Sequence, residues 1–228
     1  GREPDGTMAA ARLVWALMYA GVSRIRLLDG GIDAWLAEDR ITSPHIELAT
    51  NVGQTDERVI DSTVPWRTRS EILATTAEVQ EISKGSGNVA SKLVDVRRHG
   101  EWDGSLTHYY PFFSKAGHIP TAEFQGDWGN LVDKETHKLE PMLDSVANRW
   151  RKLGVIDSQV SQRHITLTFY CGTGWRSSIA FLVALLLGLR AKNYDSGFYG
   201  WSWNEENEIA RKVRSNSGTT MRIATYAA

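Results

Sequence analysis

The sequence predicts an α/β fold in which a mainly parallel sheet is covered by helices on both faces. Two apolar runs rich in β-branched or aromatic residues, at 93–96 and 165–170, have the pattern of buried strands. Amphipathic patterns over Ala77–Ile82 and Glu140–Leu153 predict a helix before each strand, and a long apolar run after 178 predicts a third helix. Alternation of this kind is typical of parallel sheets, whose functional sites lie at the carboxyl ends of the strands.

The composition narrows the classes of protein that the chain can represent. Its 228 residues are 42% hydrophobic with a formal net charge of −1, so the overall charge indicates neither a nucleic acid nor an anionic membrane as partner. The longest apolar run, Ile179–Leu187, is far shorter than the roughly 20 residues that span a bilayer. The six histidines show no metal-ligand spacing, and we expect neither a metal nor another cofactor.

The first 40 residues contain a pattern that returns later in the chain. A helix over 8–20 is followed by a short strand at Ile25–Leu28, the turn Asp29-Gly30-Gly31 and a short helix with Trp35. The same order recurs as a helix over 178–189, a strand at 191–194, the turn 195–197 and Trp201. We interpret this as an internal repeat with a spacing of about 165 residues.

The repeat predicts the domain organisation. Residues 1–40 would be the C-terminal half of an inactive domain, 41–61 a linker and 62–228 a complete catalytic domain, with Thr76 capping the helix that begins at Ala77. The front half of the first domain is expected as a partner, in cis or as a separate chain. A cytoplasmic location is favoured, or a mitochondrial one if a targeting segment precedes the sequence.

The single cysteine lies where the chemistry of the chain is expected. Cys171 follows the strand at 165–170, and Gly172 and Gly174 allow the backbone to curl around its sulfur with N–H groups pointing inward. Ser177 or Ser178 would cap the next helix, whose dipole favours negative charge at its start, and Arg176 adds a full positive charge. These effects favour the thiolate, which is the nucleophilic form.

Three stretches carry a resemblance to a known family. The segment 170–178 (YCGTGWRSS) resembles the active-site loop of rhodanese-type sulfurtransferases, whose cysteine carries a sulfane sulfur as a persulfide. Residues 93–98 (LVDVRR) with Glu101 and Trp102 are similar to the family's first-strand signature, and Gly117–Pro120 to its GHIP turn. Residues 193–201 resemble its closing strand and turn.

The resemblance implies a rhodanese-like fold and a tandem-domain sulfurtransferase. It implies Cys171 as the catalytic residue and Gly172, Thr173, Gly174, Trp175, Arg176 and Ser177 as the residues that bind the substrate. The expected partners are a small-molecule sulfur donor and a thiophilic acceptor, cyanide or a thiol. Thiosulfate is favoured as donor on account of Trp175 and Arg176, whereas Gly172 and Thr173 resemble the loops of 3-mercaptopyruvate sulfurtransferases.

Two other classes of protein remain as alternatives. A cysteine phosphatase or arsenate reductase also uses an anion-binding loop, but only four residues separate Cys171 from Arg176, one fewer than in the phosphatase signature. The other class is a non-enzymatic rhodanese-like interaction module, and such modules commonly lack the cysteine.

Several polar residues near the predicted site have more than one interpretation. Asp95 and Glu101 could form an acid/base pair, but we expect structural roles, with Arg97 paired to a neighbouring carboxylate and Arg98 in solvent. His118 is expected to make structural hydrogen bonds. The aromatic residues of the 101–117 loop (Trp102, Tyr109, Tyr110, Phe112, Phe113) are expected to pack, with some lining the mouth of the site.

Overall fold

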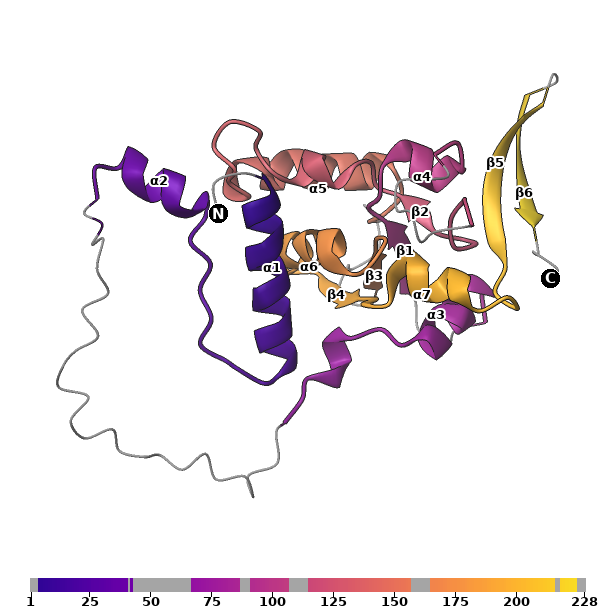
Figure 1. Cartoon of the computed structure of the whole chain (residues 1–228), viewed down its shortest axis with the longest axis horizontal. Helices are drawn as coiled ribbons and strands as arrows, with labels where there is room; N and C mark the ends of the chain where they lie inside the picture. The colour runs from indigo at the N-terminus through magenta and orange to yellow at the C-terminus, as the bar shows by residue number, and fades with distance from the viewer. Residues whose placement is uncertain are drawn as a thin grey trace.

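The computed structural model describes residues 4–40, 42, 67–86, 91–106, 115–156, 165–215 and 218–224. Its centre is a four-stranded parallel sheet in the order β2-β1-β3-β4 (Figure 1). The strands are β1 (Ser91–Asp95), β2 (Glu123–Phe124), β3 (Thr166–Tyr170) and β4 (Arg190–Asn193). The predicted strands at 93–96, 165–170 and 191–194 are thus confirmed to within two residues.

Helices cover both faces of this sheet, as the sequence predicts. One hydrophobic core joins the sheet to α5 (Leu143–Lys152) and α6 (Trp175–Leu186), with Trp150 and Phe169 fully buried in it. A second core on the opposite face joins the sheet to α3 (Thr76–Ser83) and α7 (Gly197–Trp203). A parallel sheet buries its apolar side chains on both faces only in such an arrangement.

The remaining elements are short or lie at the ends of the described chain. Three 3₁₀ helices are η1 (Ser70–Ile72), η2 (Trp128–Leu131) and η3 (Glu140–Met142), and α4 (His99–Asp103) follows β1. Strands β5 (Ile209–Ser215) and β6 (Gly218–Ala224) form an antiparallel hairpin that the sequence pattern does not predict. A bridge between Ala210 and His118 connects this hairpin to the domain. None of the described helices is both long and apolar enough to cross a membrane.

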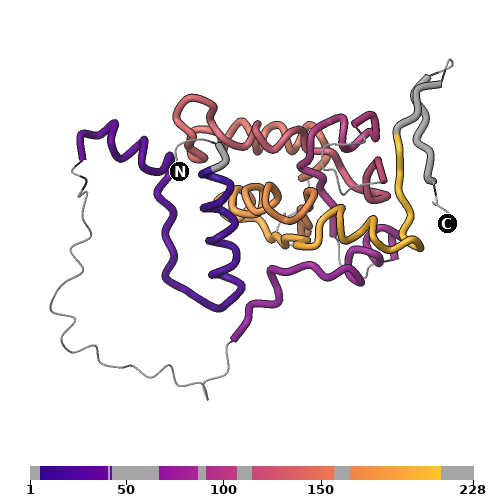
Figure 2. Tube along the Cα trace, in the orientation of Figure 1, coloured from indigo at the N-terminus to yellow at the C-terminus, as the bar shows by residue number. Residues whose placement is uncertain are grey.

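The N-terminal helix α1 (Pro4–Tyr19) packs against α6, so the predicted helix over 8–20 is confirmed (Figures 1 and 2). Ala11 and Trp15 are buried in the same core as α6, and the Trp15 indole N–H donates to the carbonyl of Ile72 at 3.4 Å. This packing binds residues 4–19 to the domain that contains Cys171.

The predicted strand at Ile25–Leu28 is wrong. Residues 22–28 are extended but pair with no strand in the described part of the chain, and a strand needs a neighbour to satisfy its backbone. The turn after it is present, and α2 (Gly31–Ala37) follows.

The two turns of the predicted repeat share one hydrogen bond and the conformation of their last glycine, but they differ at the middle residue, where φ is +80° at Gly30 and −63° at Ser196. Gly31 N–H donates to the carbonyl of Leu28 at 3.0 Å, and Gly197 N–H to that of Tyr194 at 3.1 Å, with φ of 61° and 59° at the two glycines. The division into 1–40, 41–61 and 62–228 stays a prediction, because all of 41–66 except Thr42 lies outside the described residues.

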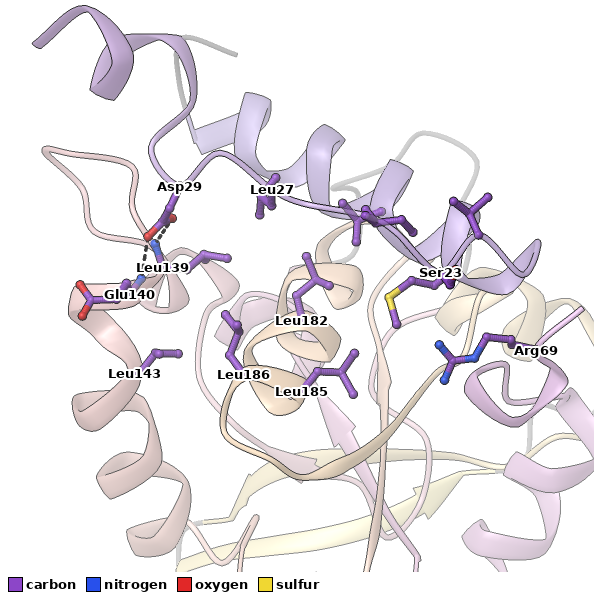
Figure 3. Close-up of a pocket in the computed structure, with 14 residues that line it drawn as sticks. Ser23, Leu27, Asp29, Arg69, Leu139, Glu140, Leu143, Leu182, Leu185 and Leu186 are labelled. Carbon is purple, nitrogen blue, oxygen red and sulfur yellow. Dashed lines mark hydrogen bonds between the residues drawn. The ribbon is translucent and has the colours of Figure 1, made fainter. Parts of the chain in front are cut away.

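The carboxylate of Asp29, in the first of these turns, binds the backbone at the start of η3. It accepts the backbone N–H groups of Leu139 at 2.7 Å and Glu140 at 3.0 Å (Figure 3). The segment 22–29 therefore bridges from α1 to the start of η3, above the apolar side of α6.

Some predicted helix starts are shifted. Thr75, one residue before the predicted cap, is the N-cap of α3, and it forms a capping box with Glu78. The helix expected from Glu140 begins as η3 and becomes α5 at Leu143, because Pro141 supplies no backbone N–H and suits a first turn.

Candidate functional site

Cys171 lies at the carboxyl end of β3, where the chain leaves the centre of the sheet. Its side chain is 1% exposed, and residues 171–174 connect the strand directly to α6. The loop before the helix is therefore shorter than the six residues expected, since Trp175 and Arg176 already belong to the first turn of α6.

The predicted serine cap is wrong. Gly174 is the N-cap of α6 with φ of +80°, a conformation that residues with a Cβ rarely adopt. The two serines instead lie inside the first turn, where their hydroxyls point back to the loop. Ser177 Oγ donates to Cys171 Sγ at 3.5 Å, and Ser178 Oγ donates to the carbonyl of Gly174 at 2.9 Å. Ser177 is thus in direct contact with the sulfur.

The first turn of α7 holds the loop from the other side. Phe198 N–H donates to the carbonyl of Cys171 at 2.7 Å, and Tyr199 N–H to that of Gly172 at 3.0 Å. A Cβ on Gly197 would lie 2.5 Å from the oxygen of Gly172. Glycine is required here because the turn and the loop approach closer than any side chain allows.

The positive charge of Arg176 is paired with a buried carboxylate and does not face the open side of the loop. Its Nη1 and Nη2 donate to the two oxygens of Glu101 at 2.7 and 2.9 Å, and both side chains are buried. A bidentate pair of this kind holds the start of α6 against α4. The pair favours a structural role for Arg176 over the expected role in binding the donor.

The other predicted loop residues differ in their access to solvent. Gly172 is buried and Thr173 is half-buried, whereas the Trp175 side chain is 46% exposed beside the loop. Thr173 and Trp175 are therefore the residues of the loop that a substrate can approach from outside. Tyr109, Tyr110, Phe112 and Phe113, expected near the mouth, lie outside the described residues.

The structural roles expected around β1 are confirmed. Arg97 donates to both oxygens of Asp95, at 3.1 Å from Nε and 2.6 Å from Nη2, and Arg98 is exposed. His118 is buried, stacks on Trp102 with 4.5 Å between ring centroids, and forms a 2.7 Å hydrogen bond with the carbonyl of Trp102 through Nδ1. Burial lowers the pKa of His118 below its usual range of about 6.5.

One residue that contacts the site was missed in the sequence. Arg12 of α1 forms an ion pair with Asp195 through Nη1, and the same nitrogen donates to the carbonyl of Gly174 at 3.5 Å. Arg12 and Gly174 are 162 residues apart, so no local pattern could connect them.

The backbone is the main source of positive potential at the loop. Arg12 and Arg176 each face a carboxylate, so their charges are largely neutralised. The first N–H groups of a helix have no partner within the helix, and α6 begins directly after the loop. A thiolate or persulfide on Cys171 would be stabilised chiefly by these groups and by Ser177.

The Cys171 loop is separate from a cavity beside α6, and no metal centre is found among the described residues. The described residues include no cluster of three or more histidine, cysteine, aspartate or glutamate side chains that could hold a metal. A cavity of about 480 Å³ lies between segment 22–29, α6 and η3, with mostly apolar walls that include Leu27, Leu182 and Leu186 (Figure 3). No residue of the Cys171 loop lines it.

Comparison with known proteins shows where this geometry recurs. The family model described as "rhodanese-like domain" matches residues 75–203, more than half of the chain. The thiosulfate sulfurtransferase YnjE of Escherichia coli is 27% identical over 219 residues, which cover 90% of this chain and 45% of that protein. The putative thiosulfate sulfurtransferase SseA of Mycobacterium tuberculosis is 31% identical over 204 residues, covering 84% and 59%. The chain thus spans about half the length of these relatives.

Solved structures are similar over most of the chain. The anaerobic ergothioneine biosynthesis enzyme of Chlorobium limicola, in complex with its natural substrate trimethyl histidine, has a TM-score of 0.70 at 29% identity. The match covers 91% of this chain and 46% of that enzyme. A structure of EanB with a cysteine persulfide and ergothioneine has a TM-score of 0.69 at 28% identity, with the same coverage.

Proposed function

Since the chain belongs to the family of rhodanese-like domains, we propose that it is a sulfurtransferase in which Cys171 carries a sulfane sulfur between a donor and an acceptor. The observation that carries this proposal is the position of the Cys171 sulfur, at the end of β3, in contact with Ser177 and beside the first turn of α6. The names of the relatives support sulfur transfer as the reaction.

The reaction proceeds in two steps that share the enzyme-bound sulfur. In the first, the Cys171 thiolate attacks the outer sulfur of thiosulfate, the S–S bond of thiosulfate breaks, and sulfite leaves with the bonding electron pair. In the second, cyanide or a thiolate attacks the outer sulfur of the persulfide, and Cys171 leaves as thiolate. Backbone N–H groups of the loop and Ser177 stabilise the anionic sulfur in both forms, as preorganised donors stabilise oxyanions.

Thiosulfate is the donor that we propose. The two curated relatives described above are named for it, and a compact dianion suits a site whose positive potential comes from backbone groups. Mercaptopyruvate would need a cation for its carboxylate. Arg97 and Arg176 are each held by a buried carboxylate, which leaves neither free for that duty.

Intact-mass measurement tests the proposal directly. The protein treated with thiosulfate and desalted should gain one sulfur atom, and cyanide should remove it with formation of thiocyanate. The variant Cys171→Ser should gain nothing. A folded wild-type protein that gains no sulfur from either thiosulfate or mercaptopyruvate, or that hydrolyses aryl phosphates at Cys171, would contradict the proposal.

A second candidate acceptor follows from the solved structures. Enzymes whose structures match 91% of this chain hold trimethyl histidine or ergothioneine, and here the exposed Trp175 offers an aromatic face to a quaternary ammonium group. Incubation of the persulfide form with trimethyl histidine separates the two acceptors. Formation of the thiolated histidine would support this candidate, and retention of the persulfide until cyanide is added would exclude it.

A further inference from the structure

The contact between Arg12 and the loop comes from outside the region that matches the rhodanese-like family. Arg12 lies in the middle of α1, whereas the family match begins at residue 75. Its Nη1 pairs with the Asp195 carboxylate and donates to the carbonyl of Gly174 (3.5 Å). Helix α1 packs against α6 (Figure 1), and the contact with the Gly174 carbonyl places Arg12 at the N-terminal end of α6.

We propose that Arg12 is a positioning residue for sulfur transfer, which fixes the Cys171 loop by tying Gly174 to the turn at Asp195. The proposal rests on the proposed function, because its subject is the nucleophile of that reaction. Arg12 acts through the loop and need not touch either substrate.

Gly174 is the point at which the loop becomes helix. Its carbonyl receives Ser178 Oγ at 2.9 Å, Asn193 Nδ2 at 3.2 Å and Arg12 Nη1 at 3.5 Å. The first two donors come from the catalytic domain itself, and only Arg12 brings a charge. The Gly174 carbonyl belongs to the same peptide unit as the Trp175 N–H, so the donors to this carbonyl fix the direction of the first N–H group of α6, directly after the Cys171 loop.

The second partner of Arg12 controls the opposite side of the loop. Asp195 lies two residues before α7, whose Phe198 and Tyr199 N–H groups hold the carbonyls of Cys171 and Gly172. The turn and Gly174 are already in close contact, since a Cβ on Gly174 would lie 2.6 Å from the Asp195 carbonyl oxygen. One guanidinium thus connects the start of α6 to the start of α7.

The surroundings of Arg12 hold it in this position. Its side chain is 21% exposed and that of Asp195 is 39% exposed, so solvent screens the pair in part. The guanidinium carbon lies 4.7 Å from the ring centroid of Trp15, whose own indole N–H is bound to Ile72. A planar cation fixed in this way can serve two acceptors at once, which a lysine does poorly.

The competing explanation is that Arg12 only attaches α1 to the domain. In that case its replacement would lower stability but leave the folded protein with normal chemistry. The two explanations are separated by measuring Cys171 itself, under conditions in which each variant is fully folded by circular dichroism.

The variants are Arg12→Gln, Arg12→Lys and Asp195→Asn, with Arg69→Gln as a control. Arg69 is exposed and pairs with Glu71 away from the loop, so the control removes the same charge. Two rates are measured: single-turnover persulfide formation from thiosulfate, and alkylation of Cys171 by iodoacetamide as a function of pH.

We expect Arg12→Gln to slow persulfide formation about tenfold, which corresponds to the loss of one charged hydrogen bond, and to shift the alkylation profile to higher pH. Arg12→Lys should restore part of the rate, and Arg12→Gln combined with Asp195→Asn should lose little more than either alone. Arg69→Gln should match the wild type.

The proposal is overturned if folded Arg12→Gln stays within about twofold of the wild type in both rates, or if Arg69→Gln loses as much. Should Arg12→Gln fail to fold, Asp195→Asn and Arg12→Lys give the same comparison. Alkylation needs no sulfur donor. A wild-type protein without persulfide would therefore refute the proposed function, while the alkylation profiles still decide the role of Arg12.

Discussion

Arg176 and Glu101, 75 residues apart in the sequence, form a buried bidentate ion pair at 2.7 and 2.9 Å. The pair links the first turn of the helix behind the cysteine to the short helix after β1. The geometry of this pair predicts what the replacement of Arg176 should do.

Replacement of Arg176 should affect stability more than donor affinity. Arg176→Met leaves the Glu101 carboxylate buried without its partner, so the free energy of unfolding should fall by about 3–5 kcal/mol in urea denaturation. The double variant Arg176→Met/Glu101→Leu should recover part of this loss, because no charge stays buried. A folded Arg176→Met protein whose KM for thiosulfate rises strongly without loss of stability would restore Arg176 as a donor ligand.

The two glycines at the ends of α6 form a matched pair for testing the loop. Gly174 and Gly188 have φ of +80° and +72°, but a Cβ on Gly188 would meet nothing within 4 Å. Gly188→Ala should therefore cost only the strain of a left-handed residue, about 1–2 kcal/mol. Gly174→Ala adds a clash with the backbone of Asp195, so it should cost more and also abolish persulfide formation. Equal losses of stability and unchanged activity in both variants would show that the loop tolerates displacement.

His118 predicts a loss of stability in acid. Burial lowers its pKa in the folded state, so the unfolded chain binds the proton first as the pH falls through 6.5. The free energy of unfolding should then decrease by up to about 1.4 kcal/mol per pH unit until the pKa of the folded state is reached. Urea denaturation is measured from about pH 7.5 to about pH 5, at about one point per half pH unit. The decrease in the free energy of unfolding should be weaker in His118→Gln than in the wild type.

Donor preference can be tested on one preparation by comparing kcat/KM for thiosulfate and 3-mercaptopyruvate. Thiosulfate should be the better donor and the more sensitive to added salt, because it is a dianion that binds largely through electrostatics. A kcat/KM that is about tenfold or more higher for mercaptopyruvate would show that Gly172 and Thr173 predict the donor better than Trp175 and Arg176 do.

The parts of the fold that depend on local pattern could be predicted from the sequence. Residues 165–170 form a strand and 175–186 a helix because their apolar residues follow those periods, and Cys171 falls between them for that reason. Strand Ile25–Leu28 has a similar local pattern but no described strand beside it, so its prediction failed. The hairpin β5–β6 was missed for the converse reason, since polar residues interrupt its apolar pattern.

The sequence did not show the contacts of the predicted site residues. Ser177 was expected to help form the site, and it contacts the sulfur directly instead of capping the helix. The partners of Arg176 and Arg12 lie 75 residues or more away, and such pairs are fixed by how helices pack and not by the spacing of residues. The sequence shows which residues are charged, but it does not show that Arg12 and Arg176 each pair with a carboxylate.

The contact of Arg12 with Asp195 and Gly174 has a thermodynamic consequence. If docking of α1 favours the loop conformation that holds an anionic sulfur, then an anionic sulfur favours docking of α1 by the same free energy, because coupling between two equilibria is reciprocal. The sulfur-loaded and unloaded proteins would then differ in how often α1 detaches. Loading Cys171 with sulfur would thus change the docking equilibrium of the N-terminal helix, whose Arg12 need not touch either substrate.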